Sequence, residues 1–306
     1  MNIIRLVRFP NLLIVAITQY LIYDLVFFDR YQQFSIHPSL DTWQLCLLVL
    51  STLCIAAGGY IINDVLDYEI DLINKPDRLI IGRIIPIRTA KQLYYWSIAL
   101  GFAISFYLAL VTDNLPLLVL YPIAVALLYF YSRYFKKSFL TGNLIVAFFC
   151  AFVAGIVWVA ERDGFTELTI ASSETAAYLR TILLFYLLFA FISTLFREII
   201  KDIEDIEGDR IGACTTLPIV LGLRRSKIIC AAIALVLILL LFSLIRVLWV
   251  NTYYLAILFA ILFIFSPIIY ALFKLYAAEN SKDFGHISQI AKLIMLTGLI
   301  MLFLIA

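Results

Sequence analysis

The stretch NDVLDYEID, residues 63–71, closes an apolar run and repeats polar side chains at every fourth position. On a helix, Asn63, Asp67 and Asp71 share one face, with Asp64 beside them. Carboxylates stacked in this way repel each other and are costly to desolvate, so such a row needs a compensating cation. Mg2+ suits it best, because Mg2+ takes oxygen ligands from a few carboxylates and from substrate phosphates.

A second stretch, KDIEDIEGD at residues 201–209, closes another apolar run. Asp202, Asp205 and Asp209 step by three and then four, which predicts a second acidic helix face. Two such faces turned toward each other would clamp a diphosphate through bridging metal. The alternative is that each row is a solvated helix end in a cytoplasmic loop.

The composition excludes an ordinary soluble domain. Of the 306 residues, 64% are hydrophobic and 14% are charged, and the mean hydropathy is +1.02, whereas soluble domains are about 45–50% apolar. We therefore expect an integral membrane protein of the all-α, polytopic class, forming a single domain over residues 1–306. Apolar runs of spanning length number nine: residues 10–28, 45–62, 93–111, 115–131, 139–160, 178–195, 228–250, 253–273 and 287–305.

The distribution of lysine and arginine predicts the orientation. With a cytoplasmic N-terminus, 19 of the 23 basic residues fall on the inner side, and only Arg30, Arg162, Arg180 and Arg246 lie outside. Both acidic stretches then face the cytoplasm of a bacterial or archaeal cell and the C-terminus lies outside. The first run is read as a membrane helix and not as a signal peptide.

Local signals place several turns. Pro10 suits a helix start, residues 113–116 form a tight hairpin turn, and Ser266-Pro267 predicts a kink. Residues 161–177 are expected to be a polar outer loop without recognisable chemistry.

Other residue types argue against competing chemistries. The five cysteines form no CxxC pair, and His37 and His286 lie in opposite loops, which argues against a histidine metal site or a histidine-based triad. The net charge of +2 says little about partners. Membrane lipids are the expected surroundings, and the sequence indicates no nucleic-acid or protein partner.

Basic residues accompany both acidic stretches. Arg78 follows the first, where it can neutralise carboxylates, bind an anion or act as a positive-inside anchor. Arg8 either anchors a helix at the headgroups or lies near a phosphate. Arg197 and Glu198 stand four residues before Lys201 and Asp202, and both signs so close together are more typical of an anion-and-metal site than of an anchor.

A metal-bound diphosphate site opening into an apolar bundle suits a substrate with a charged head and a long hydrocarbon tail, such as a polyprenyl diphosphate. Metal and basic side chains would stabilise the departing diphosphate. A cation transporter would place its carboxylates near the membrane midplane. A CDP-alcohol phosphotransferase would show an Asp-Gly-led motif that is missing here, and a non-catalytic scaffold would not need intact acidic rows.

The pattern Asn63-xxx-Asp67-xxx-Asp71 with Asp205-xxx-Asp209 resembles the paired signature of the UbiA superfamily of intramembrane prenyltransferases. The resemblance implies nine helices in a bundle around a central cavity capped by two cytoplasmic loops. It also implies Mg2+-dependent transfer of a prenyl group from a polyprenyl diphosphate to a lipid or aromatic acceptor.

By this resemblance, the metal role falls on seven residues: Asn63, Asp64, Asp67, Asp71, Asp202, Asp205 and Asp209. Diphosphate contacts fall on Asn63, Arg78, Lys136 and Lys201, and the catalytic set comprises Asp67, Asp71, Asp205, Asp209 and Lys201. Residues 197–209 with Thr216-Leu217-Pro218 are similar to the archaeal-type branch that alkylates geranylgeranylglyceryl phosphate. Leu79, where proline is common, and the absence of proline between Tyr131 and Lys136 depart from the family pattern. Acceptors of the 4-hydroxybenzoate, dihydroxynaphthoate or homogentisate type stay open.

Overall fold

The computed structural model describes residues 2–69, 72 and 79–305. Within this part of the chain the secondary structure is helical, apart from one isolated bridge between Ile81 and Ile85. Nine of the described helical segments are long and apolar enough to cross a bilayer. The all-α class and the number of spans are therefore confirmed, and the chain is an integral membrane protein.

The helices group into two compact units, which are described separately. Unit 1 comprises residues 1–136 and 155–171, and unit 2 comprises residues 137–154 and 172–306. Helix α8 (Thr141–Ala160) contributes its first part to unit 2 and its last turns to unit 1.

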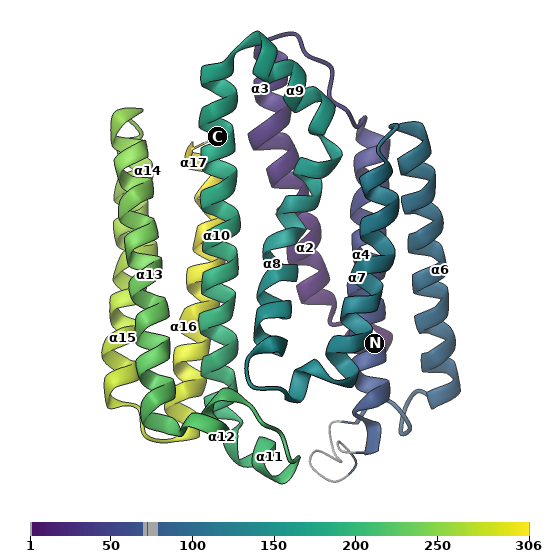
Figure 1. Cartoon of the computed structure of the whole chain (residues 1–306), viewed down its shortest axis with the longest axis vertical. Coiled ribbons are helices and arrows are strands. Elements are labelled where there is room, and N and C mark those ends of the chain that lie inside the picture. Colours follow the sequence, from purple (N-terminus) through teal and green to yellow (C-terminus); the bar gives the residue numbers. More distant parts are fainter. Residues whose placement is uncertain (1, 70–71, 73–78, 306) are drawn as a thin grey trace. The chain divides into compact units, whose positions relative to one another are not determined.

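Unit 1 contains the first four spans. They are α2 (Phe9–Leu21) continued by η1 (Ile22–Phe28) and α3 (Asp29–Gln33), α4 (Thr42–Leu66), α6 (Ile87–Val111) and α7 (Leu115–Arg133), with the short helices α1 (Asn2–Leu6) and α9 (Arg162–Ala171). Helix α4 packs against α2, α6 and α7 (Figure 1). Pro10 lies in the first turn of α2 and α7 starts at Leu115, so the predicted helix start and hairpin turn are confirmed.

Close contact between α6 and α7 depends on a glycine. The Tyr121 hydroxyl donates to the carbonyl oxygen of Ile98 at 3.0 Å, and a Cβ at Gly101 would lie 2.1 Å from that hydroxyl oxygen. A larger residue at position 101 would therefore displace the tyrosine.

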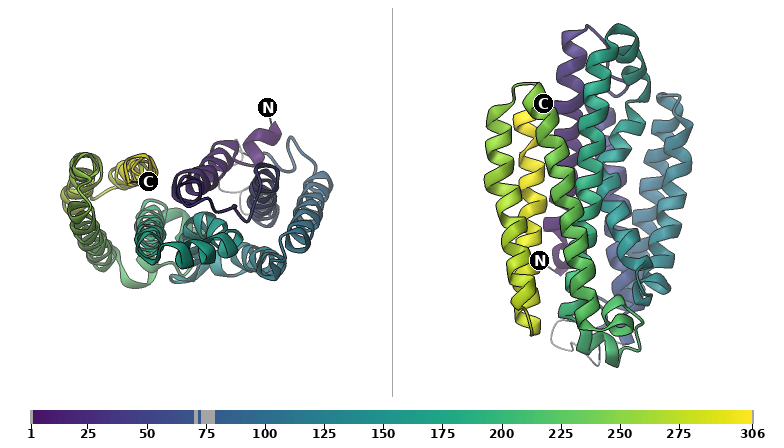
Figure 2. Two further views of the ribbon diagram at one scale, coloured as in Figure 1. Left: turned by 90° about the horizontal axis from the view of Figure 1, so that it is seen from above. Right: turned by 60° about the vertical axis from the view of Figure 1, so that its left-hand side comes forward.

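Unit 2 is built on α10 (Ser173–Glu204), which packs against α13 (Leu223–Val250) and α16 (Ser281–Ile300). Helix α14 (Tyr254–Ala260), η4 (Ile261–Phe265) and α15 (Ser266–Ala277) form one further span, and the chain ends with α17 (Leu302–Ile305). Helices α13, α15 and α16 run side by side (Figure 2). The π-helical η4 directly precedes Ser266-Pro267, so the span departs from regular α-helix beside the proline at which a kink is predicted.

Large apolar side chains cover the outside of the helices. Trp96 is 74% exposed, Leu255 67% and Phe273 68%. Exposed large apolar side chains on membrane-spanning helices fit contact with lipid.

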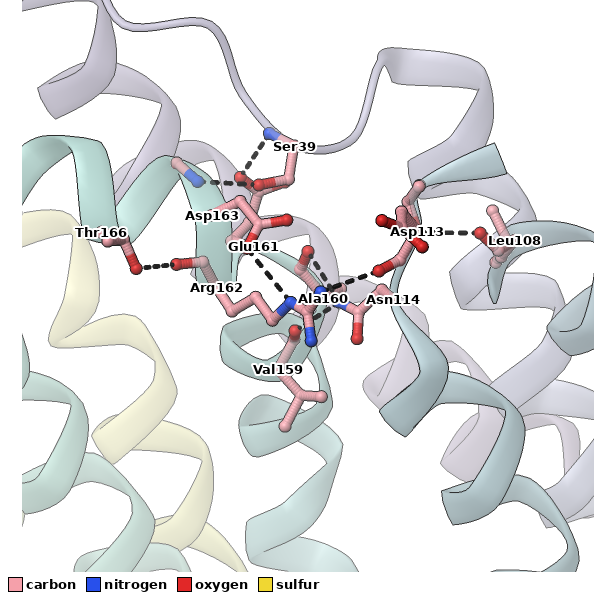
Figure 3. Close-up of polar contacts among 12 residues, drawn as sticks. Ser39, Leu108, Asp113, Asn114, Val159, Ala160, Glu161, Arg162, Asp163 and Thr166 are labelled. Atoms are coloured by element: carbon pink, nitrogen blue, oxygen red, sulfur yellow. Dashed lines mark hydrogen bonds and ion pairs between the residues drawn. The ribbon is translucent and has the colours of Figure 1, made fainter. Parts of the chain in front are cut away.

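The connection after α8 differs from the sequence prediction. Residues 162–171 form helix α9, and Glu161 is completely buried instead of lying in a polar loop. Its carboxylate accepts the backbone N–H groups of Ser39 and Leu40 at 2.9 and 3.0 Å. These partners are more than 120 residues away in sequence, so local composition could not reveal them (Figure 3).

A second set of contacts links the turn before α7 to the junction between α8 and α9 in unit 1. Asn114 donates to the carbonyl of Val159 at 2.8 Å, and Arg162 donates to the carbonyl of Asp113 at 2.7 Å. Figure 3 shows these side chains from the hairpin turn and the α8–α9 junction pointing toward one another. Polar side chains thus satisfy backbone groups that the apolar helices leave at their ends.

Candidate active site

The first acidic row lies at the end of α4. Asn63 and Asp64 are still helical, and Asp67 is the C-cap residue. Asn63 is only 8% exposed, and its amide nitrogen donates to Asp67 Oδ2 at 3.0 Å and to Asp64 Oδ1 at 3.5 Å. The predicted shared face of Asn63 and Asp67 is confirmed, because the buried amide holds the carboxylate one turn later.

Two cations from other segments of unit 1 reach this row. Arg8 Nη2 lies 3.2 Å from Asp64 Oδ1, and Lys136 Nζ forms an ion pair with Asp67 Oδ2. Arg8 stands between α1 and α2, and Lys136 belongs to the 3-10 turn η3 (Phe135–Lys137). The negative charges of the row are therefore paired with basic side chains that lie 56 and 69 residues away in the sequence.

The conformation of Arg8 favours this contact. Its φ of 51° and ψ of 53° lie in the left-handed region, which costs energy for a residue other than glycine. The guanidinium lies 4.7 Å from the ring centre of Tyr60, and Asn11 donates to the Tyr60 hydroxyl at 3.3 Å. Stacking on the ring face fixes the plane of the guanidinium beside Asp64.

An apolar cluster supports the end of α4. It consists of five buried residues from α1, α4, the segment before α6, and α6 itself: Leu6, Ile61, Ile81, Ile85 and Ala90. Val65 and Tyr68 pack against the cluster. The helix end that bears the acidic row is thus packed against buried apolar side chains, which limits the conformational freedom of the carboxylates.

The second acidic row is not carried by one continuous helix. Helix α10 ends at Glu204, Asp205 is its C-cap, and Asp209 belongs to α11 (Ile206–Ile211). The prediction of a single helical face for residues 202–209 is therefore wrong. Because the helix breaks at Asp205, the row bends where α11 begins.

Each end of the second row has a neutral partner in unit 2. Asn143 of α8 is 7% exposed and donates to Asp202 Oδ2 at 2.8 Å. The Thr216 hydroxyl donates to Asp209 Oδ2 at 3.2 Å. Lys201 is exposed one turn before Asp205. Sequence reasoning missed Asn143 and Thr216, although a lone asparagine inside an apolar span was a usable signal.

The segment after α11 is also fixed. The backbone N–H and hydroxyl of Thr215 donate to the carbonyl of Lys137 at 2.8 and 3.0 Å. Helix α12 (Leu217–Leu221) then starts with Pro218 in its first turn, and Gly222 with a φ of 79° leads into α13.

Asp71 and Arg78, both predicted site residues, lie outside the described residues. Among the residues that the structure describes, no three His, Cys, Asp or Glu side chains are grouped closely enough to hold a metal ion. The donor chemistry nevertheless fits Mg2+, since both rows offer carboxylate oxygens and hydrogen-bonding amides with no thiolate or imidazole among them.

The sequence matches the UbiA prenyltransferase family over residues 33–291. The digeranylgeranylglyceryl phosphate synthase of Sulfolobus acidocaldarius is 37% identical over 183 residues, which cover 60% of this chain and 58% of that protein. The synthase of the same name from Saccharolobus solfataricus is 36% identical over 245 residues, covering 78% of this chain and 79% of that one. The match with the Sulfolobus relative thus spans less than two thirds of that protein's length.

Solved structures share the fold. A structure concerned with digeranylgeranylglyceryl phosphate synthase in membranes has a TM-score of 0.67, with 23% identity over 99% of this chain and 97% of the other. A UbiA homologue from Archaeoglobus fulgidus bound to DMAPP and Mg2+ has a TM-score of 0.57, with 16% identity over 99% of both chains. The family resemblance expected from the two motifs is confirmed, and this chain belongs to the UbiA prenyltransferase family.

Proposed function

We propose that this protein transfers a prenyl group from a polyprenyl diphosphate to a lipid glyceryl phosphate in a Mg2+-dependent reaction, working as one domain. The observation that carries the proposal is the charge-matched row of Asn63, Asp64 and Asp67 at the end of an apolar helix. The acceptor is chosen because relatives that match this sequence at 36–37% identity are named for a glyceryl phosphate product.

Binding of the donor falls to the two acidic rows. The oxygens of Asn63, Asp64, Asp67, Asp71, Asp202, Asp205 and Asp209 would hold Mg2+, which when bound supplies positive charge to the diphosphate oxygens. Asn63 orients Asp67 through its amide, and Asn143 does the same for Asp202.

Basic side chains assist the departure of the diphosphate. When the bond between the allylic carbon and oxygen breaks, the electron pair leaves with the diphosphate, and negative charge grows there. Arg8, Arg78, Lys136 and Lys201 would stabilise that charge. The acceptor hydroxyl forms the new carbon–oxygen bond and gives its proton to an oxygen of the departing diphosphate, while the apolar helices exclude water that would otherwise capture the allylic group.

The membrane orientation is part of the proposal. The excess of basic residues near the acidic rows supports a cytoplasmic N-terminus, cytoplasmic rows and an external C-terminus. Reporter fusions after Ala306 test it: a phosphatase active only outside the cell is expected to be active there.

A product survey tests the activity. Purified protein would be incubated with Mg2+, prenyl diphosphates of several lengths and a panel of acceptors, with products identified by mass spectrometry. The panel holds geranylgeranylglyceryl phosphate, 4-hydroxybenzoate, dihydroxynaphthoate and homogentisate. Prenylated glyceryl phosphate that disappears on chelation of Mg2+ is the expected result. Products formed from the aromatic acceptors alone would refute the choice of a glyceryl phosphate as acceptor. Ion flux in vesicles without any prenylated product would support a transporter.

A further inference from the structure

Helix α10 carries a charged pair just after its apolar run, which ends at Leu195. Arg197 Nη1 donates to Glu198 Oε1 at 2.6 Å, and the two side chains are 22% and 18% exposed. Arg197 precedes the end of the helix by seven residues, which corresponds to about 10 Å along the axis. Charged side chains that are this little exposed beside a membrane span are costly and usually serve a ligand or a transport path.

The ion pair leaves part of the guanidinium without a protein partner. Arg197 Nε is buried and has no hydrogen-bond partner among the described residues. The Nε–H and one N–H of Nη2 lie along the same edge of a guanidinium, away from the Nη1 that Glu198 accepts from. That edge is the two-pronged donor that binds the oxygens of a phosphate or carboxylate.

Neighbouring charges leave this edge to a ligand. Asp202, the next carboxylate along α10, is already bonded to Asn143, and Glu198 takes one nitrogen of the arginine. Cys150 of α8 lies within electrostatic reach of both Arg197 and Glu198. A buried, unpaired N–H on a cation requires an explanation, and a bound anion supplies one.

The position of Arg197 relates it to the second acidic row. Lys201 follows Arg197 one turn later on the same face of α10, and Asp205, four residues further on, caps the end of that helix. In the proposed function the donor diphosphate binds at Lys201 and Asp205. Arg197 then lies one to two turns deeper, where a second, separate anion can be held.

We propose that Arg197, oriented by Glu198, binds the phosphate of the acceptor lipid. This inference rests on the proposed function and adds the residue that recognises the acceptor. An acceptor phosphate bound at Arg197 would place the adjacent hydroxyl of the acceptor close to the allylic carbon of the donor. That carbon is the one bonded to the diphosphate oxygen. An acceptor without an anionic group would gain nothing from the site.

Variants of Arg197 test the subsite. We compare the wild type with Arg197→Gln, Arg197→Lys and the charge-balanced pair Arg197→Gln with Glu198→Gln, which avoids an unpaired buried carboxylate. Arg180→Gln on the same helix is the matched control. Steady-state kinetics give the KM of geranylgeranylglyceryl phosphate and, separately, that of the prenyl diphosphate.

The single and the double glutamine variants should raise the acceptor KM by at least about 30-fold, the order expected for a lost charge-assisted contact. The donor KM should change by less than about 3-fold, because the donor is gripped elsewhere. The lysine variant should recover part of the loss, and Arg180→Gln should match the wild type. An unchanged acceptor KM, or equal losses for donor and acceptor, would overturn the subsite.

Direct binding separates this inference from the proposed function. Binding of geranylgeranylglyceryl phosphate, and of the same lipid without its phosphate, is measured in the absence of donor. Phosphate-dependent binding that Arg197→Gln removes supports the subsite even if the wild type shows no turnover, in which case only the proposed function fails. If the wild type turns over substrate and Arg197→Gln still binds the lipid in a phosphate-dependent way, only the subsite is refuted. The subsite is also refuted if the wild type binds the lipid equally well with and without its phosphate.

Discussion

Replacement of Glu161 by glutamine is expected to remove a pH dependence of stability. Glu161 lies completely inside unit 1, outside the spanning segments. Burial raises the pKa of its carboxyl from 4.5 to about 7, although the backbone N–H groups of Ser39 and Leu40 oppose the rise. The negative charge of Asp163 adds to the effect.

The sign follows from proton binding. Between pH 4.5 and about 7 the folded protein holds a proton on Glu161 that the unfolded chain has released. The stabilisation by this group is therefore fully present below pH 4.5 and is lost as the pH rises to about 7. The difference between the two pKa values corresponds to about 3 kcal/mol, or roughly 5 °C in melting temperature.

Thermal unfolding in detergent, followed by circular dichroism from pH 4.5 to 8, measures the effect. The melting temperature of the wild type minus that of Glu161→Gln should fall by roughly 5 °C across this range. Glu167→Gln, on the exposed side of α9, is the matched control and should keep the wild-type slope. A constant difference between the wild type and Glu161→Gln would refute the assignment of a buried titrating carboxyl.

Three further substitutions follow from the geometry of unit 1 and of α11. Gly101→Ala should lower the free energy of unfolding by about 1–3 kcal/mol, because its Cβ would lie 2.1 Å from the Tyr121 hydroxyl. Gly208→Ala, whose Cβ meets nothing within 4 Å, should not lower it in the same denaturation assay, and equal losses would contradict the packing argument. Arg8→Lys keeps the charge but loses the planar group over Tyr60, so we expect the KM of the prenyl diphosphate to rise about 3–10-fold with unchanged melting temperature. An unchanged KM would remove Arg8 from the diphosphate site.

Local signals were sufficient for much of the fold. The lengths of the apolar runs predicted the nine spans found among the described residues, since only a helix of about 20 apolar residues satisfies its backbone in hydrocarbon. Pro10 and the turn before Leu115 marked helix boundaries correctly, because proline lacks the N–H that a helix interior needs. The fourfold spacing of Asn63 and Asp67 likewise predicted their shared face, on which the two side chains are hydrogen-bonded.

The contacts that depend on distant segments were not predictable. A polar stretch such as residues 161–171 looks like a loop until Ser39 and Leu40 are known to pack on Glu161. The fourfold spacing also failed at Asp205, where the helix ends. Periodicity gives no position for this helix break, where the Ser281 hydroxyl, 77 residues away in sequence, donates to the carbonyl of Glu204 at 2.9 Å.

The central claim is that carboxylates of both acidic rows hold Mg2+ and, through it, the donor diphosphate. The most direct measurement is the affinity for a non-reactive geranylgeranyl diphosphate analogue, with and without Mg2+, in the wild type, Asp67→Asn and Asp205→Asn. The account predicts that Mg2+ tightens binding by the wild type at least about tenfold and that either substitution abolishes this gain while the protein stays folded. Full Mg2+-dependent tightening in either variant would contradict the account.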